Sequence, residues 1–551
     1  MKKKAGLVLV IVVFVANILS ACSGSYVEKI DTSKTQLYVS NFDGGIGTEW
    51  LDNIKASFEA EYADIEFEPG TGKKGAEIVI DAGKENATAS LSTSRYEVFF
   101  TEQVFYNDLI SQGNLLDISD IVRETLPNET KTIEDKLTDS QIEAFTALNG
   151  NFYVLPHYEV YSGVSYDIDL FYQKGFFLDK NGGYTKLDEQ KSTGPDGVYG
   201  TNDDGLPATY EEFFDLCERM TNFNVTPFIW KGEGYPNKLL LGVWSAYAGK
   251  EEFYLNVNYG GSGVGTSTEI ITGFNDNQPI VENVMINERN AYLLTQQAGK
   301  YYGYDFLNKI FSNEKYYNSK GLNNAFSHLD VQTEYIYSSL ENNPIAMLIE
   351  GNYWYNEAAD ALKRSINTYG ERAENRNFGW MPLPTAVSGN LQESESNKTT
   401  LCDSLTSFAF INANIADKPN QVNLAKLFLK YCYRDNSLQG FTTATGMAKG
   451  VDYSLTQEQY EGMVPYFKNM YDLRNNSEIV YPYSNHPIFI NNQSKYSFDN
   501  ASTIWNSQLS SGKYNNALTA YKDGISAKDY FLGGWATESN WTNSYSKYFR
   551  D

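Results

Sequence analysis

Strand-like and helix-like segments alternate along this chain, and that alternation constrains its fold more than any other feature. Residues 37–42 have the pattern of a short strand. Apolar side chains then recur every four residues across 50–62, as they do on one face of a helix. Further strands are predicted at 65–67, 96–100, 152–155, 226–229, 345–349 and 407–411, and further helices at 210–220 and 420–432. The order of these elements predicts an α/β fold.

Composition narrows the function. The chain has 551 residues, which predicts two to four domains of about 100–200 residues each. Its 69 acidic and 44 basic residues give a net charge of −25, which argues against a nucleic-acid partner because phosphates require clustered Lys and Arg. An aromatic content of 15% supplies ample apolar surface for a packed core, so a disordered chain is excluded.

The first residues carry a targeting signal. Three lysines at 2–4 precede an apolar run at 5–18, which is too short for a bilayer core that takes about 20 residues to cross. Leu19-Ser20-Ala21-Cys22 then resembles a bacterial lipobox, so we expect a lipoprotein signal peptide at 1–21 and a lipid on Cys22. The alternative is ordinary secretory cleavage after Ala21. A polar tether at 22–34 would hold the protein at the outer face of the cell membrane.

Cysteine and histidine are scarce, with 4 and 3 residues. If Cys22 carries lipid, Cys217, Cys402 and Cys432 remain, and three cannot all pair. Their spacing fits no metal motif, and two of them fall in helical patterns. We therefore predict that these three are small buried hydrophobic residues.

Several segments, in order, resemble the extracellular solute-binding proteins of bacterial ABC importers, in the group that includes maltose-binding proteins. Residues 96–118 resemble a strand, a ligand-facing loop and a helix of that family, and 149–171 resemble its crossing between lobes. Residues 345–354 (IAMLIEGNYW) resemble a strand and turn that carry an aromatic contact. Residues 378–384 and 407–431 resemble the return into the first lobe.

The resemblance implies two α/β lobes joined by crossing strands, with a ligand cleft between them. Lobe one would comprise 35–159 and 406–450, and lobe two 160–405 and 451–551. The expected function is to capture a saccharide, with an oligosaccharide favoured, and to deliver it to the permease subunits of a transporter. We expect a monomer that needs no cofactor and catalyses no reaction.

Ligands of open α/β sheets bind beyond the carboxyl ends of strands. The residues that follow each predicted strand are therefore the candidate ligand contacts. Tyr158 and Tyr161 alternate in direction, so only one should face the cleft. Either Tyr353 or Trp354 should stack on the sugar, although an aromatic residue is more often part of a core. Thr101 could instead cap a helix. The predicted ligand residues are Thr101, Glu102, Gln103, Tyr158, Glu159, Tyr161, Trp230, Lys231, Tyr235, Tyr353 and Trp354.

A glycine-rich acidic loop at 194–205 could hold Ca²⁺, which takes six to eight oxygen ligands. The candidate ligands are Asp196, Asn202, Asp204 and Glu211, although Gly200 stands where an EF-hand would begin with a ligand. The alternative is a solvated acidic turn before a helix.

Two other functions compete with solute binding. A lipid-anchored glycoside hydrolase would need two carboxyl groups, about 5–5.5 Å apart in a retaining enzyme, and the chain is rich in carboxylates. No Gly-x-Ser-x-Gly, His-Glu-x-x-His or Walker motif occurs in the sequence. A cell-surface adhesin is the third possibility. The ordered set of family-like segments favours the binding protein over both.

Overall fold

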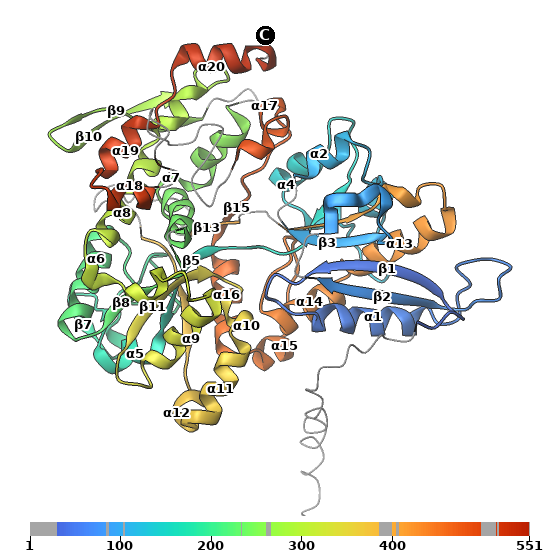
Figure 1. Cartoon of the computed structure of the whole chain (residues 1–551), viewed down its shortest axis with the longest axis horizontal. Helices are drawn as coiled ribbons and strands as arrows, with labels where there is room; N and C mark the ends of the chain where they lie inside the picture. The colour runs from blue at the N-terminus through green and yellow to red at the C-terminus, as the bar shows by residue number, and fades with distance from the viewer. Residues whose placement is uncertain are drawn as a thin grey trace, which may run out of the picture.

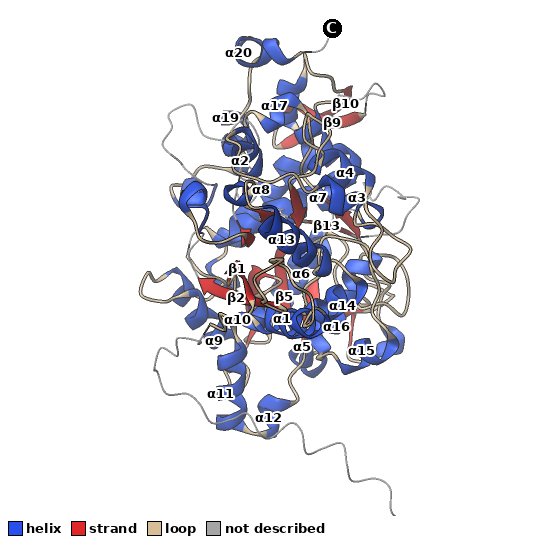
Figure 2. Cartoon of the chain, turned by 90° about the vertical axis from the view of Figure 1, so that its right-hand side faces the viewer, coloured by secondary structure: helices blue, strands red, loops and turns tan. Residues whose placement is uncertain are grey.

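The chain folds into two lobes, each built around its own sheet (Figure 1). The computed structural model describes residues 30–83, 87–102, 105–232, 234–260, 266–384, 399–403, 407–496, 514 and 517–549. Cys22 and Gln103 lie outside these residues. Helices surround the strands (Figure 2), and each sheet has its own hydrophobic core, as expected of an α/β protein.

Lobe one contains a five-stranded sheet in the order β2-β1-β3-β14-β4. Its strands are β1 (Thr35–Phe42), β2 (Ala76–Gly83), β3 (Val98–Glu102), β4 (Val154–Pro156) and β14 (Ser407–Ile411). β1 pairs in parallel with β2 and β3, whereas β14 runs antiparallel to β3 and β4. A strand from late in the sequence therefore lies between two early ones, so lobe one is discontinuous.

The helices of lobe one likewise come from both ends of the chain. α1 (Glu49–Glu61) buries Trp50, Ile54 and Phe58, the four-residue pattern predicted from the sequence. α14 (Asp435–Thr445) packs against α1, and α13 (Pro419–Tyr431) packs against β1 and β14. The other helices near this sheet are α2 (Tyr106–Ser111), α3 (Ser119–Arg123) and α4 (Asp139–Phe145).

The predicted strand at 65–67 is wrong. Glu66 Oε1 accepts hydrogen bonds from the backbone N–H of Gly70 (2.9 Å) and Gly72 (3.1 Å), which fold this segment into a turn. The second strand is β2, ten residues further along, and it pairs with β1 over its whole length. Its sequence, AEIVIDAG, combines a buried half with an exposed half and shows neither regular alternation nor a continuous apolar run.

Lobe two contains a four-stranded sheet in the order β12-β5-β11-β8. Its strands are β5 (Ser162–Asp167), β8 (Thr226–Ile229), β11 (Ile345–Gly351) and β12 (Phe378–Met381). β8 and β11 are parallel, and the other neighbours are antiparallel. Each sheet thus has parallel neighbours, β1 with β2 and β3 in lobe one and β8 with β11 in lobe two, and their carboxyl ends meet at one edge of the sheet.

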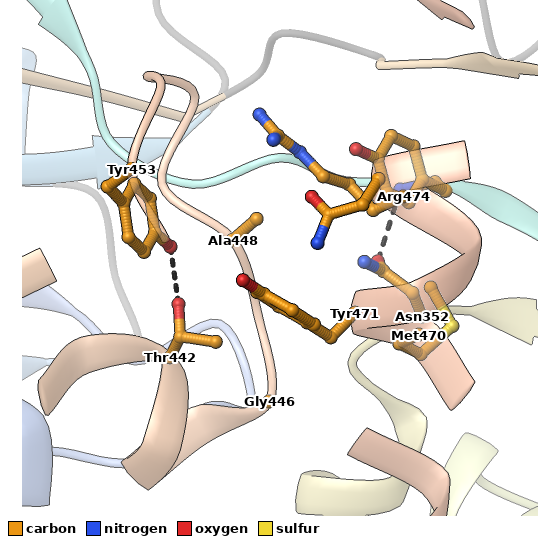
Figure 3. A pocket seen from close by; sticks show the side chains of 10 residues that line it. Asn352, Thr442, Gly446, Ala448, Tyr453, Met470, Tyr471 and Arg474 are labelled. Atoms are coloured by element: carbon orange, nitrogen blue, oxygen red, sulfur yellow. Dashed lines mark hydrogen bonds between the residues drawn. The ribbon is translucent and has the colours of Figure 1, made fainter. Parts of the chain in front are cut away.

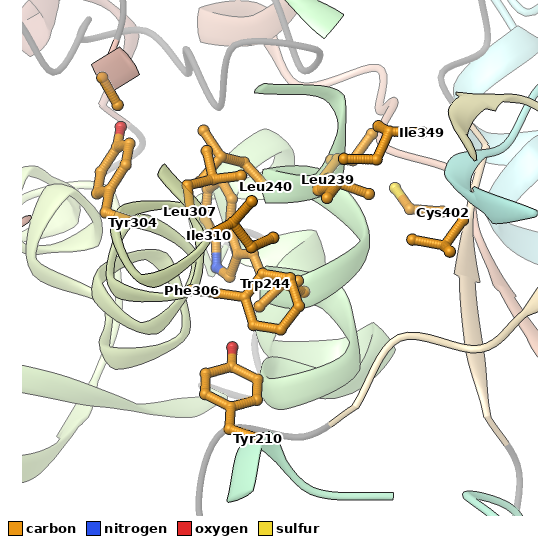
Figure 4. Packing of buried hydrophobic residues seen from close by; sticks show 14 of the residues in the cluster. Tyr210, Leu239, Leu240, Trp244, Tyr304, Phe306, Leu307, Ile310, Ile349 and Cys402 are labelled. Atoms are coloured by element: carbon orange, nitrogen blue, oxygen red, sulfur yellow. The ribbon is translucent and has the colours of Figure 1, made fainter. Parts of the chain in front are cut away.

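The lobe-two core has two clusters. Part of the larger one lies between α7 (Lys238–Asn258) and α8 (Ala298–Phe311), where Trp244, Phe306 and Leu307 interdigitate (Figure 4), and the smaller one contains Trp354. Trp541 of the C-terminal helix α20 (Glu538–Tyr545) is also buried in this core. The remaining helices are α5 (Ile168–Lys174), α6 (Tyr210–Asn222), α9 (His328–Ser338), α10 (Trp354–Glu357), α11 (Ala359–Tyr369), α12 (Glu371–Glu374), α15 (Gln457–Gly462), α16 (Pro465–Asn476), α17 (Pro487–Ile490), α18 (Ala517–Lys522) and α19 (Ala527–Gly533).

Two-stranded ribbons complete the part of the fold that the structure describes. They are β6 (Phe177–Leu178) with β7 (Tyr184–Thr185), β9 (Ser267–Asn275) with β10 (Gln278–Met285), and β13 (Thr400–Cys402) with β15 (Glu478–Val480). Cys217, Cys402 and Cys432 are buried, as predicted for them. Among the helices that the structure describes, none is long and apolar enough to cross a bilayer.

Candidate ligand site between the lobes

The loops that follow the parallel strands of the two sheets meet at the interface between the lobes. In lobe one, the loop at 43–47 follows β1, and Glu102 ends β3. In lobe two, Tyr235 comes after β8 and Tyr353 after β11. Side chains at the carboxyl ends of parallel strands are the usual ligand contacts of α/β proteins. We call this region the interlobe site.

The loop after β1 exposes backbone at its glycines, Gly44, Gly45 and Gly47. Asp43 Oδ1 accepts hydrogen bonds from Gly45 N–H (3.2 Å) and Gly47 N–H (3.1 Å), which holds the loop in a tight turn. A Cβ atom on Gly44 would lie 2.5 Å from the hydroxyl oxygen of Tyr158 and closer still to the Glu102 carboxylate. The Tyr158 hydroxyl and the Glu102 carboxylate therefore both lie against the Gly44 backbone.

Tyr353 is the lobe-two residue at the centre of the interlobe site. It is half-buried and packs against the hydrophobic core of lobe one, although it follows a lobe-two strand. Its ring lies across Gly351, where a Cβ atom would be 2.5 Å from the ring carbon Cζ. Burial raises the pKa of Tyr353 well above its ordinary value. Neighbouring groups raise this pKa further, in decreasing order the Glu350 carboxylate, the Tyr235 hydroxyl, and the carboxylates of Glu357 and Glu102. Carboxylates from both lobes thus surround one tyrosine.

The two lobe-two carboxylates are positioned by α9. Gln332 Nε2 donates to Glu357 Oε2 (2.8 Å) and to Glu350 Oε1 (3.4 Å). The backbone N–H of Gly351 donates to Glu350 Oε2 (2.9 Å), and His328 Nε2 lies 3.9 Å from Glu357 Oε1. Carboxylates accept hydrogen bonds from hydroxyl groups, and tyrosine rings offer flat apolar faces. The chemistry suits a ligand that has many hydroxyl groups.

Trp354 has a different place from the one predicted for it. It is 0% exposed, and the rings of Tyr335, Phe378, Tyr466 and Tyr355 surround it at centroid distances of 5.4–5.7 Å. A ring packed edge-on by four others belongs to the lobe-two core and has no face open to a ligand. The stacking prediction for Trp354 is corrected accordingly, and stacking by Tyr353 stays a prediction.

Trp230 is also a core residue. It is 1% exposed and packs against Phe311 (5.3 Å) and Tyr317 (4.9 Å), because the strand β8 carries it directly into the interior of lobe two. The next residue, Lys231, is half-buried, and its Nζ donates to the carbonyl of Asn323 (3.0 Å). The burial of Trp230 contradicts the predicted ligand contact there, whereas a ligand contact at Lys231 stays a prediction.

Glu159 and Tyr161 belong to the connection between the lobes. The fully buried Glu159 carboxylate accepts hydrogen bonds from Arg474 Nε (3.1 Å) and Nη2 (3.0 Å), from the Tyr481 hydroxyl (2.5 Å) and from the Tyr161 hydroxyl. The backbone N–H of Val160 donates to Asp403 Oδ1 (2.8 Å). These bonds join separate crossings of the chain at the connection between the lobes, which we call the hinge, so Glu159 and Tyr161 are hinge residues. Tyr158 is 1% exposed in the lobe-one core, with its hydroxyl oxygen against Gly44, so its ring has no open face for a ligand and the predicted contact is corrected.

A small cavity lies beside this hinge (Figure 3). Thr442, Gly446 and Ala448 line it from the lobe-one side, and Met470 and Tyr471 of α16 line the other side. Its volume of about 10 Å³ has room for about one water molecule. It is too small to be the solute site.

Thr101 lies within β3, 3% exposed, where it pairs with Phe408 across the sheet. It caps no helix, because α2 begins at Tyr106 after Phe105. Glu350 and Glu357 were not among the ligand residues predicted from the sequence. Both lie within or just after the family-like segment at 345–354, which was the signal that could have found them.

The predicted calcium ligands are not gathered around one point. Asp196 Oδ1 accepts from the Val198 N–H (2.7 Å), Asp204 Oδ2 accepts from the Gly200 N–H (2.8 Å), and Glu211 is exposed on α6. The Asn202 side chain donates to Asp472 (2.9 Å). Asp203, which the prediction omitted, is buried, and burial raises its pKa to about 6. Across the described ranges, no group of three or more His, Cys, Asp or Glu is arranged to hold a metal ion, and calcium binding stays a prediction.

Comparison with known proteins identifies the fold. Neither models of protein families nor curated proteins match the sequence. Among solved structures, a chitin oligosaccharide binding protein matches with a TM-score of 0.51 and 14% identity over 94% of this chain and 98% of that one. A probable secreted solute-binding lipoprotein from Streptomyces coelicolor matches with a TM-score of 0.52 and 13% identity over 92% and 99%. RafE from Streptococcus pneumoniae matches with a TM-score of 0.51 and 14% identity over 92% and 98%. The chain therefore has the two-lobed α/β fold of bacterial solute-binding proteins.

Proposed function

We propose that this protein is a lipid-anchored, extracellular substrate-binding protein of an ABC importer and that it captures a saccharide. The observation that carries the proposal is the interlobe site, where Glu102 of lobe one lies near Tyr353 of lobe two and the glycine loop of lobe one lies against Glu357 of lobe two. A solute that touches both lobes favours their closed arrangement over an open one, which is how two-lobed receptors retain a ligand.

The side chains of the site support a saccharide as the solute. Tyrosine rings cover the apolar C–H faces of pyranose rings, and carboxylates accept hydrogen bonds from sugar hydroxyl groups. Proteins with this fold include a receptor named for chitin oligosaccharides and one from a study of xylan utilization, with a TM-score of 0.52. An oligosaccharide is therefore the favoured class. The protein binds and delivers its solute without chemical change.

The anchor and the partner follow from the amino-terminal sequence. Lipid on Cys22 would tether the receptor to the outer face of the cell membrane, and the polar residues 23–34 would let it reach the permease subunits of the transporter. A fatty-acid probe fed to cells should label the wild-type protein and should not label Cys22→Ala. Labelling of the variant would contradict the anchor but would leave the solute untouched.

The central experiment is isothermal titration of the purified protein against a panel of neutral oligosaccharides, with amino acids and short peptides as controls. We expect heat from one or more glycans, unchanged glycan by chromatography after incubation, and weaker binding by Tyr353→Ala. Binding to peptides alone would refute the solute class. Shortened glycan products would support a hydrolase instead.

A further inference from the structure

One short lobe-two element makes three separate contacts with lobe one. α10 and the residue before it follow strand β11 of lobe two. Tyr353 packs against the lobe-one core. Asn356 Nδ2 donates a hydrogen bond of 2.5 Å to the backbone carbonyl of Thr445, at the end of α14. Glu357 meets the glycine loop at Gly45. These contacts lie on three different parts of lobe one: its core, a helix end and a loop.

The contact with Gly45 leaves no room for a side chain. A Cβ atom on Gly45 would lie 2.7 Å from Glu357 Oε1 and 2.8 Å from its Cδ, with Cγ nearer still. The φ of Gly45 is +94°, in a region that favours glycine. Gly47 has a similar backbone, with φ of +74°, but nothing lies within 4 Å of the position that its Cβ would take.

Glu357 cannot easily move away. Its Oε2 accepts the 2.8 Å hydrogen bond from Gln332, so the carboxylate is held to α9 of its own lobe. Because the closest atom to Gly45 is Cγ, near the start of the side chain, clearing a Cβ would require a new χ1 rotamer and the loss of that bond. In an arrangement with separated lobes, the same Cβ would meet no lobe-two atom.

We propose that Tyr353, Asn356 and Glu357 form a closure latch and that Gly45 is the residue that lets it engage. Gly45 and Glu357 act as positioning residues: they decide how far the lobes can close, and hence the affinity for any solute held between them. A ligand gains affinity only to the extent that the closed state is populated, so a variant that blocks closure weakens binding without touching the ligand. The proposal does not depend on the solute being a saccharide.

The test compares Gly45→Ala with Gly47→Ala, which both place alanine at positive φ. Each purified protein, without added solute, is measured for radius of gyration by small-angle X-ray scattering and for interlobe distance by fluorescence transfer between one label on each lobe. We expect Gly45→Ala to raise the open-to-closed ratio by about tenfold or more, since closure then requires the rotamer change. Gly47→Ala should match the wild type in both measurements, because its side chain meets nothing.

Two further variants keep the test decisive. Gly45→Ala combined with Glu357→Ala removes the clash and should return the interlobe distance to that of Glu357→Ala alone. Asn356→Ala leaves Gly45 intact and should also shift the population toward open, so a folding defect in Gly45→Ala would not leave the latch untested. The latch is overturned if Gly45→Ala and Gly47→Ala have equal interlobe distances, if the double variant stays as open as Gly45→Ala, or if Asn356→Ala has no effect.

Discussion

Two adjacent aromatic residues, Tyr353 and Trp354, should respond to removal in opposite ways. Tyr353 is half-buried at the interlobe site, and Trp354 is 0% exposed in the lobe-two core. Each is replaced by alanine in an otherwise unchanged chain. Because the two positions are neighbours in the sequence, each variant is a control for the other, and any difference reflects where the side chain lies.

The structure sets the expected magnitudes. Trp354→Ala would leave a cavity among four aromatic rings, and buried Trp→Ala changes cost about 3–5 kcal/mol of folding free energy. Tyr353→Ala would remove a ring that is only partly buried in the protein alone but would cover a bound sugar. Loss of that stacking face should cost about 1–3 kcal/mol of binding free energy, which is about 5- to 150-fold in affinity.

The assay has two measurements on each variant: thermal unfolding of the protein without solute, and titration calorimetry with the glycan that binds the wild type most tightly. We expect Trp354→Ala to unfold at a much lower temperature and its folded fraction to bind within a few-fold of the wild type. Tyr353→Ala should unfold near the wild-type temperature and bind weakly. The reverse pattern would refute the correction of Trp354 to a core residue and would return it to the ligand site.

Three more perturbations test other parts of the molecule. Lys300 is 1% exposed, its Nζ has no hydrogen-bond partner among the described residues, and burial lowers its pKa from 10.5 to about 7. The unfolded chain therefore binds the proton more tightly, and the free energy of unfolding should rise as the pH rises from about 7 to 10.5. Lys300→Met should therefore stabilise the protein at pH 7 by about 3–4 kcal/mol in urea unfolding and should flatten the dependence of unfolding free energy on pH. The control is Lys309→Met, on the exposed side of the same helix, which should change stability by about 0.5 kcal/mol or less. Glu159→Gln leaves the Arg474 guanidinium, which is 17% exposed, without its carboxylate partner. The change should cost about 3 kcal/mol in the same unfolding measurement, the low end for breaking a buried pair. A loss below about 1 kcal/mol would show that the pair does not hold the hinge. If the acidic loop binds calcium, millimolar Ca²⁺ should raise the melting temperature, and a chelator should reverse the rise. Asp204→Asn should abolish the rise. Equal melting temperatures with and without Ca²⁺ would exclude the site.

Much of the fold could be read from local pattern. The four-residue spacing across α1 and the apolar runs of β11 and β14 predicted these elements within a few residues, because one buried face imposes its period on the residues that form it. The two-lobed architecture was expected only from the family resemblance, since no local pattern says that β14 inserts between β3 and β4. β2 was missed because its two halves differ in burial and hide the period.

The ligand site depended on the tertiary structure. Aromatic character and a position after a strand apply equally to Tyr353 and Trp354, and the packing of Tyr335, Phe378 and Tyr466 decides that only the second is core. A carboxylate after a strand can face a ligand or, as with Glu159, bind an arginine more than 300 residues away along the chain. Contacts between segments far apart in the sequence decide which partner lies opposite a side chain. Such contacts do not produce a periodic pattern in the local sequence, so they cannot be predicted from it.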